Sequence, residues 1–126
     1  MSNLRILVVD DDVLIGMLLG DMLRTMDHSV CATALTQEDA VADAAEHLPD
    51  LMIVDVRLGR GSGIEAVDEI LLSRNVPYFF MTGNIAKLRA LRPHSAALEK
   101  PFGEAELATA IRLATRCAAS PQVGPG

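Results

Sequence analysis

Short runs of apolar residues recur along this chain, and several of them end in a charged or hydroxyl side chain. Such a run is typical of a strand that is buried on both faces of a parallel sheet. In open α/β sheets the carboxyl ends of the strands form the edge at which ligands bind. The runs and the polar residues that follow them are residues 6–9 with Asp10-Asp11-Asp12, 51–54 with Asp55, 78–81 with Thr82-Gly83, and 96–98 with Glu99-Lys100-Pro101.

Helical patterns separate these runs, so that strand and helix alternate five times. Polar residues that can serve as N-caps precede the first two helices: Asp12 before one, and Thr36 before the other with Asp39 at the capping-box position. The predicted strands cover residues 4–9, 30–34, 51–54, 76–81 and 96–98, and the predicted helices cover residues 12–26, 36–47, 62–73, 85–91 and 103–117.

Alternating strands and helices predict an α/β fold, with a parallel sheet covered by helices on both faces. Right-handed crossover connections restrict the topology. We expect a flavodoxin-like, doubly wound (βα)5 fold whose five-stranded parallel sheet has the order 2-1-3-4-5, with the first and third strands side by side. The pattern predicts one domain over residues 1–118 and a flexible C-terminal tail over residues 119–126, which is rich in Pro and Gly.

Composition narrows the class of protein. The chain has 126 residues, which suits one domain, and half of them are apolar although only one Tyr and three Phe are present, so the core must be aliphatic. A formal net charge of −6 argues against binding to a nucleic-acid backbone. We find no apolar run long enough for a membrane span and no export signal. Two lone cysteines, Cys31 and Cys117, are typical of a reduced, cytoplasmic protein.

The predicted topology crowds the carboxylates of Asp10, Asp11 and Asp55 together. Two carboxylates about 4 Å apart repel by roughly 4 kcal/mol at an effective dielectric constant of about 20. A hard cation such as Mg²⁺ would compensate this charge, and without it the carboxylate pKa values should rise. Lys100 is a second source of positive charge, because a buried ammonium needs a partner.

Each of these residues also has a plainer interpretation. The Asp run can simply cap the first helix, and Asp12 is expected to do only that. Thr82 can be a turn residue, and Lys100 can be an edge lysine whose ammonium reaches water. The stronger argument is that all the groups fall on the same sheet edge.

On these residues the chain resembles, over residues 4–118, a receiver domain of two-component response regulators. The family pattern is an acidic pair after the first strand, Asp after the third, Thr or Ser after the fourth and Lys-Pro after the fifth. The matching residues are Asp10-Asp11, Asp55, Thr82 and Lys100-Pro101.

The resemblance implies that Asp55 is a nucleophile that accepts a phosphoryl group from a phosphohistidine. The donor would be a sensor histidine kinase, or a histidine phosphotransfer protein. Thr82 and Lys100 would hold the phosphoryl oxygens. Such a domain catalyses only its own phosphotransfer and slow dephosphorylation, so it is not an enzyme in the ordinary sense.

The resemblance also implies a Mg²⁺ site. Asp11 and Asp55 would bind the ion directly, together with the backbone carbonyl of Arg57, and Asp10 would act largely through water. Phosphoryl transfer depends mostly on positioning and charge neutralisation, which such a site provides.

The chain departs from the family pattern at the fifth strand. The aromatic residue usually found two or three positions before the lysine is replaced by Ala97 or Leu98. The aromatic switch of the family should therefore not be carried over. The interval from Thr82 to Lys100 is short, so the helix at 85–91 has lost about a turn.

Residues 77–83, Pro-Tyr-Phe-Phe-Met-Thr-Gly, are similar to the Phe-Ala-Thr-Gly motif of single-domain receivers found with alphaproteobacterial sensor kinases, some of which have a mobile fourth helix. The usual Met-Pro after the phosphoacceptor is replaced by Leu58-Gly59, within a segment, 57–63, that we expect to be a flexible loop.

The first helix carries more apolar residues than a core-facing stripe can bury. Eight of the eleven residues 13–23 are large and apolar, so we expect an exposed apolar patch beside the site. In the family this helix docks the helical bundle of the kinase. The alternative is that Leu14 and Met17 are scattered surface residues, which are common.

The favoured function is a stand-alone phosphoacceptor that signals through phosphorylation-dependent protein interaction or drains phosphate from a relay. A Mg²⁺-dependent phosphatase would need an acid/base Asp two residues after Asp55, where Arg57 stands. A binding module that does not need phosphorylation is a third possibility, and phosphoryl uptake distinguishes it from a receiver. The sequence leaves the kinase, the downstream target and the oligomeric state open.

Overall fold

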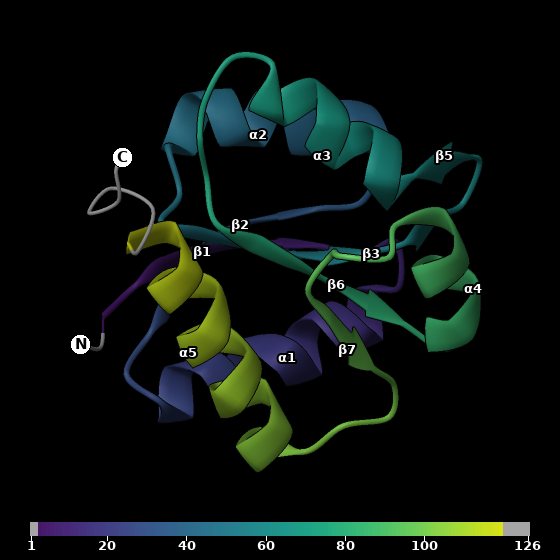
Figure 1. Cartoon of the computed structure of the whole chain (residues 1–126). Coiled ribbons are helices and arrows are strands. Elements are labelled where there is room, and N and C mark those ends of the chain that lie inside the picture. The colour runs from purple at the N-terminus through teal and green to yellow at the C-terminus, as the bar shows by residue number, and fades with distance from the viewer. Residues whose placement is uncertain (1–2, 120–126) are drawn as a thin grey trace.

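The five-stranded parallel sheet has the predicted topology (Figure 1). The structure is a computed structural model that describes residues 3–119, with side chains described through Arg116. The strand order is β2-β1-β3-β6-β7, which is the order 2-1-3-4-5 in terms of the strands of this sheet. The bounds of the strands are Arg5–Val9 (β1), Ser29–Ala34 (β2), Leu51–Asp55 (β3), Tyr78–Thr82 (β6) and Ala97–Glu99 (β7).

Helices cover both faces of the sheet, with α1 and α5 on one face and α2 and α3 on the other (Figure 1). The predicted N-caps are confirmed: Asp12 accepts hydrogen bonds from the N–H groups of Leu14 and Ile15, and Thr36 accepts one from Asp39. The bounds of the helices are Val13–Thr25 (α1), Gln37–His47 (α2), Gly63–Leu71 (α3), Ile85–Leu91 (α4) and Glu104–Ala119 (α5).

The last helix extends one residue beyond the predicted domain boundary at residue 118. The rest of the predicted tail, residues 120–126, lies outside the described residues, as does the side chain of Cys117. Cys31 is a free thiol. No helix within residues 3–119 combines the length and apolar character needed to cross a bilayer.

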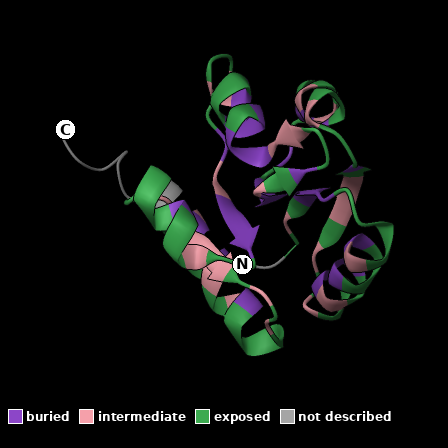
Figure 2. Cartoon of the chain, turned by 90° about the vertical axis from the view of Figure 1, so that its right-hand side faces the viewer, coloured by how far each residue is buried: buried purple, intermediate pink, exposed green. Residues whose placement is uncertain are grey.

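The core consists of two apolar layers, one on each side of the sheet. Successive residues of β1 alternate between them: Leu7 and Val9 pack with α2 and α3, whereas Ile6 and Val8 pack with α1 and α5. Figure 2 shows that the buried residues gather on the sheet and the inner faces of the helices. Because the inner strands are covered on both sides, nearly every position on them must be apolar.

The segment after β3 is not the flexible loop that the sequence predicts. Arg57–Leu58 (β4) and Gly61–Ser62 (β5) form a short antiparallel hairpin, whose turn contains Gly59 at a φ of 56°. Leu58 is buried in the core, and the N–H of Ser62 donates a hydrogen bond of 3.0 Å to Oε1 of Gln37 in α2. These two tertiary contacts order a segment whose composition suggests flexibility.

Gly63 lets α3 start directly against the end of β3. Its N–H donates a 2.8 Å hydrogen bond to the carbonyl of Val56. A Cβ at this position would overlap the carbonyl oxygen of Asp55 and come within 2.8 Å of Cγ1 of Val54. The absence of a side chain at residue 63 therefore allows the backbone around Asp55 to take its position.

We expect Gly63→Ala to lower the free energy of unfolding by at least about 2 kcal/mol, because the added methyl group meets backbone atoms that cannot move aside. Urea denaturation measures this loss. Gly83→Ala is the matched control, since a Cβ there has nothing within 4 Å. Equal stabilities of the two variants would contradict the close packing of α3 on β3.

His28 joins the first two strands at the opposite end of the sheet from the carboxylates. Its Nδ1 accepts a 3.1 Å hydrogen bond from the N–H of Leu4. Burial lowers the pKa of His28 below its usual value, and the nearby charge of Asp27 opposes this shift only in part. The folded protein therefore favours the neutral imidazole, which can accept the hydrogen bond.

The unfolded chain binds a proton at His28 more readily than the folded protein does, so the contribution of His28 to stability is complete above pH 6.5 and is lost as the pH falls through the folded-state pKa. We expect the free energy of unfolding to fall more steeply between about pH 7.5 and 5 for the wild type than for His28→Gln. Parallel curves from urea denaturation at each pH would contradict this assignment.

Candidate functional site

Three carboxylates meet at the carboxyl ends of β1 and β3. These strands are neighbours in the sheet, and Val9 pairs with Val54, so Asp10 and Asp55 emerge side by side. Asp10, Asp11 and Asp55 can each offer a carboxylate oxygen within 4.8 Å of the others. Asp10 is completely buried and Asp55 is 8% exposed, whereas Asp11 lies at the surface. The crowding that the topology predicts is confirmed.

Lys100 brings a positive charge to this cluster. Its Nζ lies 3.4 Å from Oδ2 of Asp55 and 3.7 Å from Oδ2 of Asp10. Its backbone N–H donates a 2.8 Å hydrogen bond to the carbonyl of Thr82, and the bond between Lys100 and Pro101 is a cis peptide. The predicted pairing of Lys100 with the acidic cluster is confirmed, and its side chain remains about one quarter exposed, at 26%.

The protonation of Asp55 reflects these neighbours. Burial raises the pKa of Asp55, and the negative charge of Asp10 raises it further, while the ammonium of Lys100 lowers it in part. The predicted rise is thus confirmed for Asp55. One ammonium does not compensate the two buried carboxylates fully.

The carboxylate of Asp10 is only partly satisfied by hydrogen bonds. Its Oδ1 accepts a 2.9 Å hydrogen bond from the N–H of Asp12. Its Oδ2, however, is the one buried side-chain N or O atom in the described part of the chain that lacks a hydrogen-bond partner. This oxygen and the two neighbouring carboxylates form a group of oxygen ligands of the kind that Mg²⁺ prefers. The residues present therefore fit this ion.

The cluster lines a cleft of about 330 Å³ that the β4–β5 hairpin borders. Arg57 of β4 lines this cleft, as does Gly59 in the turn. A Cβ on Gly59 would lie 3.5 Å from Oδ2 of Asp11, so the turn passes directly beside this carboxylate. The place of Gly59 beside the site was not predicted, although a Gly that can adopt a positive φ in a two-residue turn was the available signal.

Thr82 ends β6 and is almost completely buried. Its Oγ1 accepts a 3.0 Å hydrogen bond from the N–H of Asn84. Asn84 in turn caps α4, because its Oδ1 accepts a 3.0 Å hydrogen bond from the N–H of Lys87. Thr82 thus has the turn role of the plainer interpretation, and it also lies on the same sheet edge as the carboxylates.

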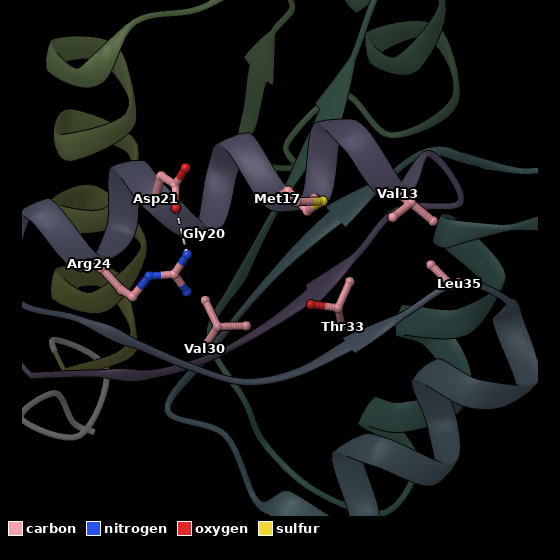
Figure 3. A pocket seen from close by; sticks show the side chains of 9 residues that line it. Val13, Met17, Gly20, Asp21, Arg24, Val30, Thr33 and Leu35 are labelled. Atoms are coloured by element: carbon pink, nitrogen blue, oxygen red, sulfur yellow. Dashed lines mark hydrogen bonds and ion pairs between the residues drawn. The ribbon is translucent and has the colours of Figure 1, made fainter.

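The exposed apolar patch on α1 is confirmed. Val13, Leu14, Met17 and Leu18 are each more than half exposed, at 57%, 63%, 62% and 54%. Val13 and Met17 also border a groove between α1 and the edge strand β2, at one end of which Arg24 pairs with Asp21 of the same helix (Figure 3). The patch begins one residue after Asp12, which lines the carboxylate cleft.

The family described as the response regulator receiver domain matches residues 6–112 of this chain. The chain is similar to the transcriptional regulatory protein PdtaR of Mycobacterium tuberculosis, with 36% identity over 114 residues that cover 87% of this chain and 56% of PdtaR. It is also similar to the phyllosphere-induced regulator PhyR of Methylorubrum extorquens, with 35% identity over 85% of this chain and 42% of PhyR. The chain spans about half the length of these relatives.

Two solved structures support the same assignment. The solution structure of the receiver domain of PhyR from Erythrobacter litoralis has a TM-score of 0.86 at 35% identity and covers 96% of both chains. The crystal structure of PhyR from Brucella abortus has a TM-score of 0.86 at 28% identity, over 97% of this chain and 51% of that one. The fold, the clustered carboxylates and the sequence relationships agree, and the chain belongs to the response regulator receiver domain family.

Proposed function

We propose that this chain is a phosphoacceptor in a two-component relay and that Asp55 receives the phosphoryl group. The observation that carries this proposal is the position of the Asp55 carboxylate, beside buried Asp10 and 3.4 Å from the ammonium of Lys100. The partner that supplies the phosphoryl group is a sensor histidine kinase or a histidine phosphotransfer protein in the cytoplasm.

In the proposed transfer an oxygen of Asp55 attacks the phosphorus of a phosphohistidine. The N–P bond breaks, its electron pair stays on the imidazole nitrogen, and Asp55 carries the phosphoryl group as an acyl phosphate. Lys100 neutralises a phosphoryl oxygen, and the hydroxyl group of Thr82 donates a hydrogen bond to another. Both residues lie on elements that end at the same sheet edge, which keeps them in position for the transfer.

Asp11, Asp55 and the backbone carbonyl of Arg57 would hold Mg²⁺, with Asp10 acting largely through water. When bound, the ion supplies the positive charge that offsets the phosphoryl oxygens. Oδ2 of Asp10 supports this assignment, because it is buried and lacks a hydrogen-bond partner, which is costly unless a cation or its waters satisfy it.

We propose that the phosphorylated chain acts on another protein, or drains phosphate from the relay. One solved relative, PhyR of Bartonella quintana, is seen in complex with the anti-sigma factor NepR. A protein regulator of this kind is therefore a reasonable class of target for the present chain, whose net charge of −6 does not suit a nucleic-acid backbone.

The first test is the intact mass of the protein after incubation with acetyl phosphate or phosphoramidate and Mg²⁺. We expect one phosphoryl group on the wild type, dependent on Mg²⁺, and none on Asp55→Asn. Asp43→Asn, a change outside the site, is the matched control and should be modified like the wild type. An unmodified wild type with both donors would contradict the proposal and favour a binding module that needs no phosphorylation.

Arg57 should control the lifetime of the phosphorylated state, because it lines the same cleft as Asp55 and its long side chain could admit or block an attacking water. We expect Arg57→Ala to change the dephosphorylation rate more than twofold, about 0.4 kcal/mol in barrier height. Mg²⁺ affinity should stay nearly constant, since the backbone carbonyl remains. Arg60→Ala on the same hairpin is the control, and an unchanged decay rate in Arg57→Ala would remove Arg57 from the mechanism.

A further inference from the structure

A second cavity lies beyond Arg57, between the end of β3 and helix α4. Its volume is about 370 Å³, which falls within the range typical of small-ligand sites. We call it the α4 cavity. Arg57 lines both this cavity and the carboxylate cleft, but no aspartate of the cluster lines the α4 cavity. The residues that carry its chemistry are Val56, Arg57, Thr82, Lys87, Leu88 and Leu91.

The charged groups of the α4 cavity are all positive. Its lining includes Arg57 and Lys87 and no carboxylate. Both residues are exposed, and neither forms an ion pair with another described residue. Arg92 differs, because Asp68 holds its guanidinium with two hydrogen bonds of 3.0 and 2.6 Å. Arg57 and Lys87 therefore keep their charge available to an anion, although the chain as a whole has a net charge of −6.

Three aliphatic residues, Val56, Leu88 and Leu91, also line the cavity, beside the polar side chains of Thr82 and Asn84. Leu88 is buried at its base, Val56 is half-buried, and Leu91 is 60% exposed at the end of α4. Residues 85–98 contain three basic residues and no acidic one, so this stretch also lacks an internal partner for the cations. A ligand that is complementary to both the two cations and the aliphatic residues of the cavity has a negative charge next to an aliphatic group.

We propose that the α4 cavity binds an acidic segment of a protein partner, in which a carboxylate side chain stands next to an aliphatic one. The carboxylate pairs with Lys87 and Arg57, and the aliphatic side chain covers Leu88 and Leu91. Charge complementarity favours this occupant, and the aliphatic residues of the cavity favour it over a bare anion. Thr82 lies in the wall, so the occupant contacts a residue that, on the proposed function, also holds a phosphoryl oxygen.

The probe for the test is the capped dipeptide N-acetyl-Glu-Leu-amide, added to the full, unphosphorylated chain without Mg²⁺. Under these conditions the result does not depend on phosphoryl transfer to Asp55. We expect ¹⁵N–¹H NMR shifts confined to residues 56–57 and 82–91. The neutral analogue N-acetyl-Gln-Leu-amide should bind about two- to fivefold more weakly, which is the range for a partly exposed ion pair.

Lys87→Ala and Arg89→Ala form a matched pair on the same short helix. Both residues are exposed, but only Lys87 lines the cavity, and neither change should disturb folding because Ala favours helix. Lys87→Ala should weaken binding of the Glu-Leu probe about two- to fivefold, whereas Arg89→Ala should leave it unchanged.

Several results would overturn the proposal. One is the absence of NMR shifts at a probe concentration on the order of 10 mM. This concentration is well above the dissociation constant expected for a ligand of this size that binds specifically. Another is equal binding of the Glu and Gln probes, or an equal effect of the two variants. Shifts at the same residues from inorganic phosphate, as large as those from the peptide, would show a simple anion site rather than a site for an acidic segment.

Discussion

Two almost completely buried carboxylates, those of Asp10 and Asp55, share one ammonium group at the edge of the sheet. Lys100 lies within 4 Å of both, and without it two adjacent negative charges would be confined in a poorly solvated place. The backbone arrangement follows from this need. Strands β1 and β3 end side by side, β7 returns the chain to the same edge, and Gly63 allows α3 to start against the carbonyl of Asp55. The remaining charge imbalance is what makes the site suited to a cation and a phosphoryl group.

The site extends into α4 through hydrogen bonds rather than through apolar packing. Thr82 holds the N–H of Asn84, and Asn84 caps the helix at Lys87. At the other end, Arg92 binds Asp68 of α3, and Leu88 is the buried side chain of the helix. Hydrogen bonds at its two ends and one buried side chain therefore hold this short helix in place. The neighbouring strand β7 has Ala97 and Leu98 at the positions where the family usually has an aromatic residue.

Much of the fold could be predicted because burial on both faces forces β1 and β3 to be continuously apolar, and the polar residues after them then mark one edge. Asp10 and Asp55 could be located in this way, whereas Lys100 follows the half-buried edge strand β7 and was located because a buried ammonium needs an acidic partner. The β4–β5 hairpin could not be predicted, since strands of two residues have no periodicity and their order depends on the contacts of Leu58 and Ser62 with distant residues. The α4 cavity depends in turn on how that hairpin and α4 pack.

The two apolar layers have a consequence for how substitutions combine. Ile6 and Leu7 are neighbours in sequence, yet the sheet separates their side chains into different apolar layers. The energetic effects of truncating both residues should therefore be nearly additive, as they are for distant sites. By contrast, Leu7 and Val54 lie in one layer, where the space left by one truncation can be partly filled by relaxation around the other. Thermodynamic independence in this domain thus follows the side of the sheet and not the distance along the chain.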